Sequence, residues 1–237
     1  QFLSGNPLLE LDLRLVHRQV EQCMKRKSSQ QPLRIVDLGC GTGRVAHRLS
    51  GFDVHVLNID LSESMLKECK KLHLNPTKFA EVRGNMAELD FLKPDSIDLA
   101  CCLFSSIGML RPREQRIACL NQTFNALKPS GRFLLHVHNR FQSLWDPGGI
   151  WWLVSGYVAG KFGRSEWGDR IYPYRGLPRM FLHIYSRREL LADLRAAGFQ
   201  HIDLLPIHSS GEELISANSW FQSFRAGGFF AIAQKQP

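Results

Sequence analysis

The stretch "IVDLGCGTGR", residues 35–44, decides the fold of this chain. An apolar run ends in Asp37, and Gly39, Gly41 and Gly43 follow on alternate residues. Because glycine adopts positive φ values and lets a ligand approach the main chain, this spacing is typical of a binding loop between a strand and a helix. The acid beside the loop indicates that the charge of the ligand matters.

Short apolar runs follow at intervals, and amphipathic stretches such as "EQRIACLNQTFNALK" separate them. Strands that alternate with helices indicate a parallel sheet covered on both faces. We therefore expect an α/β, doubly wound, mostly parallel sheet of seven strands. The runs expected as strands are Leu33–Leu38, Val54–Ile59, Phe79–Val82, Ile97–Leu103, Phe133–Val137, His201–Ile207 and Phe229–Ala233.

The 237 residues suit one large domain. We expect an N-terminal helix within 1–30, with the helical pattern at Leu8–Lys27, and a ligand-binding core at 33–139. An insertion at 140–186 and a C-terminal helix with a strand pair at 187–237 complete the predicted domain. "LKPSGRF" should end a helix at Pro129 and turn at Gly131 into the fifth strand.

The insertion has its own composition. From 140 to 188 the chain holds all four tyrosines, four of the five tryptophans, and eight Lys or Arg against three Asp or Glu. Such a segment predicts a cap over a site, with aromatic rings to stack a planar group and cations to hold phosphate or carboxylate. The alternative is that the tryptophans form a small core of the cap itself. The candidate cations are Lys161, Arg164, Arg170, Arg175 and Arg179.

Composition also limits the class of protein. The net charge of +8 favours acidic partners, and none of the six cysteines forms a C-x-x-C pair. We expect free thiols in a reducing, cytoplasmic protein. No run approaches the roughly 18 apolar residues of a membrane span. The chain begins with Gln1, so a removed targeting segment stays open, as does the oligomeric state.

The glycine loop admits two ligand classes. A dinucleotide site requires G-x-G-x-x-G, but here the third glycine comes one residue early and Arg44 takes the last place. A Walker loop is excluded because no Gly-Lys-Ser/Thr follows. The carboxylate of Asp37 beneath the loop suits a cationic ligand better than a pyrophosphate.

The residues resemble the class I S-adenosylmethionine-dependent methyltransferases over roughly Leu33–Asn139. "VDLGCGTGR" resembles their first motif, and Asp60 in "VLNIDLSESML" matches the acid that takes the ribose hydroxyls. "GNMAEL" and "DLACCLFSSIGML" resemble the third and fourth motifs, with an Asn where the family usually has Asp. Each motif alone could have a purely structural role. The interpretation depends on the order in which the four motifs occur.

The resemblance implies a Rossmann-like methyltransferase fold with S-adenosylmethionine as cofactor. Asp37 would offset the positive charge of the cofactor, and Leu61 and Met65 would line its adenine. The implied cofactor-binding residues are Asp37, Gly39, Cys40, Gly41, Gly43, Asp60, Leu61, Met65, Asn85, Met86, Leu103, Phe104 and Ser105.

A general base is useful when an amine or hydroxyl acceptor must lose a proton. "LLHVHNR" places His136 and His138 on one strand face, and His138 lies nearer the carboxyl end. We take His138 as the candidate base, with activity expected to rise through the histidine pH range; a hydrogen-bonded core histidine is the alternative. His183, Tyr174 and Tyr185 are further candidates. The H-x-H pair lacks a third ligand, so no metal is expected.

The favoured acceptor is a small molecule methylated on N or O. "LFSSIGML" resembles the fourth-strand loop of small-molecule N-methyltransferases, and the Asn/Asp-Pro-Pro-aromatic motif of exocyclic-base enzymes is missing. RNA is an alternative acceptor, because "RMFLHIYSRREL" resembles a segment of transfer-RNA wobble-uridine methyltransferases and the cap is basic. A non-catalytic cofactor-binding subunit is the second alternative.

Overall fold

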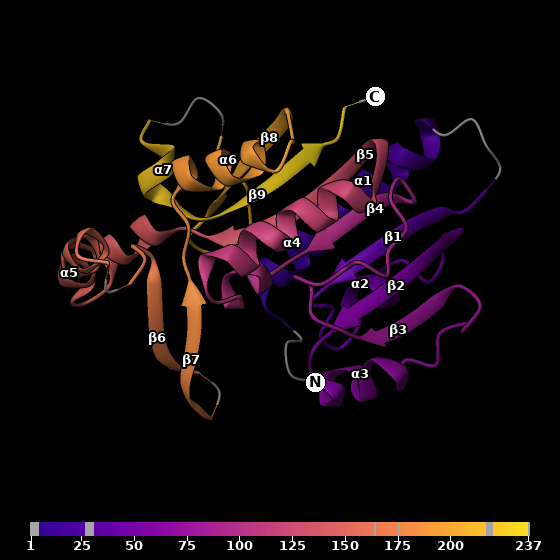
Figure 1. The fold of residues 1–237 in the computed structure, drawn as a ribbon, viewed down its shortest axis with the longest axis horizontal. Coiled ribbons are helices and arrows are strands. Elements are labelled where there is room, and N and C mark those ends of the chain that lie inside the picture. The colour runs from indigo at the N-terminus through magenta and orange to yellow at the C-terminus, as the bar shows by residue number, and fades with distance from the viewer. Residues whose placement is uncertain (1–4, 27–30, 164, 175, 217–219, 237) are drawn as a thin grey trace.

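The computed structural model describes residues 5–26, 31–163, 165–174, 176–216 and 220–236. Seven strands form one sheet in the order β3-β2-β1-β4-β5-β9-β8, in which β9 runs in the direction opposite to the other six strands (Figure 1). The predicted doubly wound, mostly parallel sheet is therefore confirmed. Its strands are β1 (Leu33–Leu38), β2 (Val54–Asp60), β3 (Phe79–Arg83), β4 (Ile97–Cys102), β5 (Leu127–His138), β8 (His201–His208) and β9 (Ala226–Gln234).

Helices cover both faces of the sheet, as the strand pattern requires. Ile35 and Leu134 join one core with α1 and α2, while Val36 and Leu135 join the other core with α4 and α6. This alternation arises because successive side chains of a strand point to opposite faces. The helices are α1 (Pro7–Arg26), α2 (Arg44–Arg48), α3 (Glu63–Lys70), α4 (Arg113–Ala126), α6 (Arg187–Ala196) and α7 (Gln222–Arg225), with a 3-10 turn η1 (Ser106–Met109).

The strand order places the ligand site. The chain runs outward from β1 through β2 to β3 and then returns to β4 on the other side of β1. Strand order thus reverses between β1 and β4, and ligands bind outside the carboxyl ends of strands at such a switch point. Asp37 pairs in register with Asn58 of β2 and Cys101 of β4, so the ends of the three strands are level.

The insertion lies between β5 and α6, as expected. It consists of the 3-10 turn η2 (Arg140–Trp145), α5 (Gly149–Lys161) and a separate hairpin of β6 (Asp169–Tyr174) and β7 (Leu177–His183). Figure 1 shows α5 at one end of the long axis of the molecule, beyond the hairpin.

The insertion has a small core, but not all of its tryptophans enter it. The Trp167 indole donates to the carbonyl oxygen of Leu153 at 3.0 Å and lies 4.6 Å under the guanidinium of Arg140. Trp145 and Trp151 instead remain 74% and 78% exposed. The core interpretation therefore holds for Trp167 and is wrong for the two exposed rings.

The predicted start of the fifth strand is wrong. β5 begins at Leu127, directly after α4, and includes the segment that was expected to form a turn. The register with β4 shifts between Ile97 and Leu99, and Ser130 adopts a φ of 64°. A local irregularity inside the strand thus replaces the expected loop.

Two further expectations concern cysteines and membranes. All six cysteines are free, and five of them are buried. Within the described ranges, no helix has the length and apolar character that crossing a membrane requires. Lys27, the expected last residue of the first helix, lies outside the described residues.

Candidate cofactor site at the glycine loop

The three glycines of the loop have left-handed φ values of 71°, 56° and 79°. A Cβ on Gly39 would lie 2.8 Å from Cβ of Ser106, and one on Gly43 would lie 2.3 Å from Sγ of Cys69. A Cβ on Gly41 would meet no atom within 4 Å. Gly39 and Gly43 are therefore required by packing as well as by φ, whereas Gly41 faces open space where a ligand can approach the backbone.

Asp60 holds this loop from the end of β2. Its Oδ2 accepts from the backbone N–H of Gly41 at 2.8 Å, and its Oδ1 accepts from the N–H of Ser62 at 2.8 Å. Each carboxylate oxygen has the capacity to accept a second hydrogen bond, so Asp60 can still hold vicinal hydroxyls. Leu61 and Met65 lie beside it in the sequence with 66% and 42% of their surfaces exposed, although they are large and apolar. This is the geometry expected of residues that cover a ribose and an adenine.

Asp37 at the end of β1 is 3% exposed. Burial raises the pKa of this carboxyl to about 7; the positive charge of Arg44 opposes the rise and the negative charge of Asp60 adds to it. A cation bound against Asp37 would favour the ionised form and lower this pKa.

Asp12 of α1 is a second buried carboxylate at the same place. It is 1% exposed, and its Oδ2 lies 2.7 Å from Nδ1 of His136, while its Oδ1 has no hydrogen-bond partner among the described residues. A narrow cavity of about 20 Å³ separates α1 from the glycine loop, and two buried carboxylates on one cavity favour a cation. The cavity is lined by Leu9, Asp12, Leu13, Asp37, Gly39, Cys40, Arg44, Val45 and Leu103.

This arrangement fits the implied cofactor. The α-ammonium of S-adenosylmethionine would supply the missing partner of Asp12 and the cation beside Asp37. Asp12 is not among the residues predicted from the sequence, although one signal for it is present. With Leu9 and Val16 it follows helical spacing, so a carboxylate stands on the apolar face of an amphipathic helix.

The remaining loop and third-motif residues have local roles. The Cys40 thiol is buried and donates to the carbonyl oxygen of Gly41 at 3.7 Å. The side-chain amide of Asn85 donates to Glu88 at 3.0 Å and accepts from the N–H of Ala87 at 3.0 Å, so its polar atoms close a turn. Met86 lies against the loop, with its methyl carbon 3.6 Å from the position of a Cβ on Gly39.

The end of β4 carries strained backbone. Phe104 and Ser105 have φ values of 51° and 62°, which cost roughly 1 kcal/mol or more each for residues with a Cβ. Ser105 is fully buried; its N–H donates to the carbonyl of His136 at 2.9 Å, and its Oγ accepts from the N–H of His138 at 3.2 Å. Ser105 thus joins β4 to β5, and Leu103 is the fourth-strand residue that lines the cavity.

His138 is half-buried at the end of β5, with its ring edge-on to those of Phe104 and His136 at 5.6 and 5.4 Å. Burial, together with His136, lowers the pKa of His138 to about 3. The ring is therefore neutral at physiological pH, with a lone pair but little proton affinity. With a pKa of about 3, His138 would not titrate in the range through which activity was expected to rise, and its role as a base stays a prediction.

Of the other candidate bases, His183 is already engaged on both ring nitrogens. His183 is fully buried, with Nδ1 2.8 Å from Asp169 and Nε2 2.8 Å from Glu189. Burial alone would lower the pKa of His183, but the two hydrogen bonds outweigh it and raise the pKa. Burial also raises the pKa of Tyr185, whose hydroxyl has no partner within the described part of the chain. The side chain of Tyr174 lies outside what the structure describes.

Glu166, His183 and Glu189 bring possible metal-ligand atoms within 4.8 Å of one another. Arg116 pairs with Glu166, however, and Arg140 pairs with Glu189. Protein cations thus already neutralise the carboxylates, and the raised pKa of His183 favours a protonated ring, which cannot bind a metal. We interpret the cluster as an ion-pair network that fixes the insertion to α4 and α6.

A wider cleft of about 820 Å³ lies beside this network. Among residues of described placement, none lines both this cleft and the cavity at the glycine loop. Of the predicted cations whose placement the structure describes, only Lys161 lines the cleft, with its ammonium 5.2 Å from the ring of Tyr157. Arg170 lies 5.3 Å from the ring of Trp152, Arg179 is exposed, and Arg164 and Arg175 lie outside the described residues.

Comparison with known proteins agrees with this geometry. A family model described as a methyltransferase domain matches residues 35–131. YqeM of Bacillus subtilis, which is named as a methyltransferase, is 32% identical over 110 residues. The match covers 46% of this chain and 44% of the Bacillus protein, so less than half of either is aligned. A demethylmenaquinone methyltransferase of Leptospira interrogans is 28% identical over 179 residues, covering 72% of this chain and 68% of that protein.

A solved structure extends the similarity over the whole fold. The Burkholderia thailandensis 1,6-didemethyltoxoflavin N1-methyltransferase, with bound 1,6-didemethyltoxoflavin and S-adenosylhomocysteine, has a TM-score of 0.61 at 16% identity. The superposition covers 100% of this chain and 82% of the Burkholderia protein. The resemblance noted in the sequence is thus confirmed at two levels: residues 35–131 match a methyltransferase domain, and the fold is that of solved S-adenosylmethionine-dependent methyltransferases.

Proposed function

We propose that the protein transfers a methyl group from S-adenosylmethionine to a nitrogen or oxygen atom of a small molecule. The observation that carries the proposal is the pair of buried carboxylates, Asp12 and Asp37, on one narrow cavity beside an open glycine loop. Asp60 adds an acceptor for hydroxyls at the other end of the loop. Ammonium and vicinal ribose hydroxyls are the groups of S-adenosylmethionine that such a site recognises.

The cofactor, when bound, supplies a methyl group activated by its sulfonium. The contribution of the chain is to hold and orient both reactants and to exclude water, which can be worth about 7–11 kcal/mol. Asp12 and Asp37 bind the ammonium, and Asp60 binds the ribose. Phe104 and His138, at the ends of β4 and β5, form the rim at which an acceptor approaches.

The low pKa of His138 limits what it can do for the acceptor. A base this weak accepts a proton poorly from an amine or an aliphatic hydroxyl. The site therefore favours an acceptor that already has a lone pair at neutral pH, such as an uncharged amine, a ring nitrogen or an acidic hydroxyl. His138 would then position that atom by a hydrogen bond and would contribute little as a base.

Two observations support a small acceptor over RNA. The similar proteins from Leptospira and Burkholderia carry the names of small acceptors. Lys161 and Arg170 in the insertion lie against the rings of neighbouring aromatic residues. They do not form an open basic strip of the kind that tracks a phosphate backbone.

The test begins with binding. Calorimetry with S-adenosylhomocysteine should detect binding that Asp60→Asn weakens and that Asp203→Asn, an exposed β8 aspartate, leaves unchanged. Release of S-adenosylhomocysteine from S-adenosylmethionine is then measured with metabolite and RNA pools at several salt concentrations. Turnover with metabolites that changes little with salt supports the proposal. RNA turnover that falls steeply with salt would contradict it, and binding without turnover in any pool would favour a non-catalytic subunit.

A further inference from the structure

Helix α5 presents an apolar stripe to solvent. Ile150, Trp151, Val154 and Val158 follow helical spacing and are about half exposed or more, and Phe162 directly after the helix is 76% exposed. Rotation by 100° per residue places all five within one third of the helix circumference, and the buried Leu153 lies outside that sector. We call these five residues the α5 stripe. A surface of this kind on a soluble fold marks an interaction site.

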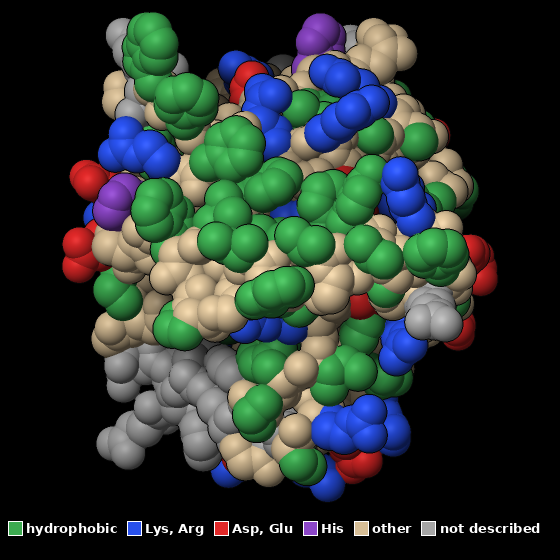
Figure 2. Space-filling model, turned by 90° about the vertical axis from the view of Figure 1, so that its left-hand side faces the viewer, with side chains coloured by type: hydrophobic (Ala, Val, Ile, Leu, Met, Phe, Trp, Pro, Cys, Tyr) green, Lys and Arg blue, Asp and Glu red, His purple; other side chains and the backbone are tan. Residues whose placement is uncertain are grey.

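The stripe belongs to a larger apolar surface. Trp145 precedes α5, and its indole donates to the carbonyl oxygen of Phe224 at 3.4 Å, which brings α7 next to η2. Trp220 and Phe221 at the start of α7 are 82% and 72% exposed. Figure 2 shows this face as a band of hydrophobic side chains with Lys and Arg above and below it, while Asp and Glu lie mainly at the edges.

Charge indicates what kind of surface would cover the band. Between residues 140 and 188 the chain has an excess of five positive charges. Two of the three acids there, Glu166 and Asp169, are engaged with Arg116 and His183 in the ion-pair network. A second copy of the same face would carry the same positive charge and be repelled, whereas an anionic surface would be attracted.

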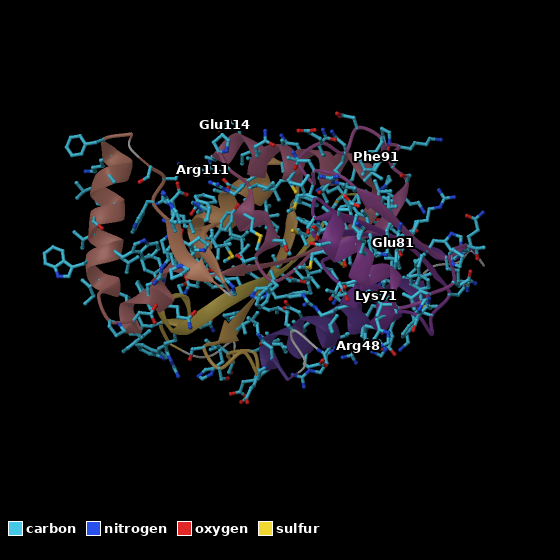
Figure 3. The ribbon with its side chains drawn as sticks, turned by 90° about the horizontal axis from the view of Figure 1, so that it is seen from below. Arg48, Lys71, Glu81, Phe91, Arg111 and Glu114 are labelled. Carbon is cyan, nitrogen blue, oxygen red and sulfur yellow. The ribbon has the colours of Figure 1, made fainter. Side chains whose placement is uncertain are left out.

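The position and chemistry of α5 favour a bilayer over an acidic protein. Figures 1 and 3 place the helix at one end of the molecule, so a flat surface can meet it without contacting the sheet first. The α5 stripe offers one hydrogen-bonding group, the indole N–H of Trp151, so it has little to pair with the polar rim of a protein partner. Exposed tryptophan and aliphatic side chains can enter the apolar part of a membrane interface, and basic side chains near them are attracted to anionic headgroups.

We propose that the α5 stripe docks the protein on the surface of a bilayer that contains anionic lipids. The helix would lie parallel to the membrane plane, with Trp151 and Phe162 among the acyl chains and headgroups. Lys161, in the last turn of α5, would remain in the headgroup layer. With 13 residues α5 is too short to span the bilayer. This proposal goes beyond the methyl-transfer function and does not depend on it.

The experiment is co-sedimentation with vesicles of equal parts phosphatidylcholine and phosphatidylglycerol, compared with phosphatidylcholine alone. The protein should bind the mixed vesicles more tightly, bind less at high salt, and shift its tryptophan fluorescence to the blue. The double variant Trp151→Ala, Phe162→Ala should lose affinity by at least about tenfold. Phe91→Ala is the matched control, because Phe91 is an exposed aromatic residue distant from α5 (Figure 3).

Three results would overturn the proposal. They are no binding to the mixed vesicles, equal binding by the double variant, and a dimer in analytical ultracentrifugation that the double variant abolishes without any lipid binding. Circular dichroism melts and retained binding of S-adenosylhomocysteine show that the double variant is folded. Those controls also separate failure of the docking proposal from failure of the proposed function.

Discussion

Cofactor binding should be linked to the ionisation of Asp37. Burial raises the pKa of this carboxyl to about 7, while a bound ammonium group requires the ionised form. From this pKa, about 9% of Asp37 is ionised at pH 6 and about half at pH 7. Apparent affinity scales with the competent fraction, so it should rise about fivefold over that interval. Binding at pH 7 should release about half a proton.

Calorimetry with S-adenosylhomocysteine at pH 6 and pH 7, in buffers of different ionisation enthalpy, measures both quantities. The measurements stop at pH 7 because the α-amino group of the ligand begins to lose its own proton near pH 8. Asp37→Asn should bind more weakly at both values, without the rise and without proton release; Asp203→Asn should behave as the unchanged protein does. Equal wild-type affinity at the two pH values, or a rise of the same size in Asp37→Asn, would refute the reasoning.

The same pKa has a consequence for stability. Since the folded pKa is raised above the unfolded 3.8, the free energy of unfolding should fall as pH rises from about 4 to 7 and level off above it. The difference corresponds to at most about 4 kcal/mol. Asp37→Asn should therefore stabilise the ligand-free protein at pH 8, which denaturant titration would show; a destabilised variant would contradict a buried, unfavourable carboxylate.

Three further predictions concern other parts of the site. Gly43→Ala should destabilise the protein by about 1–3 kcal/mol, because residue 43 has a φ of 79° and a Cβ there would meet Cys69. Gly51→Ala is the control and should not destabilise the protein, because a Cβ there would have no atom within 4 Å. Urea titration of the two variants measures the difference. His183 has a raised pKa, so its stabilising ion pairs are complete below pH 6.5 and should be lost as pH rises through the folded pKa. His183→Gln should remove this alkaline loss from thermal melts, and an unchanged melting profile would count against the network. His138→Gln should lower turnover by about tenfold or less without adding or removing a pH transition between 5 and 8, as initial rates would show.

The fold was predictable because its signals are local. Strand-length apolar runs, the helical periodicity between them and the left-handed glycines of the loop each occupy a few consecutive residues. Asp37 and Asp60 follow from the same rule, because acids at the ends of neighbouring parallel strands must meet at one edge of the sheet. Residues whose position depends only on strand order and loop geometry could therefore be predicted from the sequence.

Contacts between distant elements were not predictable. Asp12 meets His136 across 124 residues, and Arg116 meets Glu166 across 50, in both examples through packing that no short motif encodes. The pKa of His138 depends on the burial that this packing produces, so its value was also inaccessible. The insertion showed the same limit: its composition was plain, but which rings stay exposed depends on how α5 lies against η2.

Because Asp12 lies on α1, the protection of this helix should show whether the cavity holds a ligand. Leu9 and Asp12 form one wall of the cavity, so a molecule that fills it bridges α1 to the loop after β1. Binding of the ligand would slow amide-hydrogen exchange throughout α1 and protect its peptide bonds from proteases. This protection would arise although most of the bound nucleoside would contact other segments. A chain cut before Leu33 would lose this wall together with the apolar residues of α1 that cover one face of the sheet, so ligand retention and folding would be lost together.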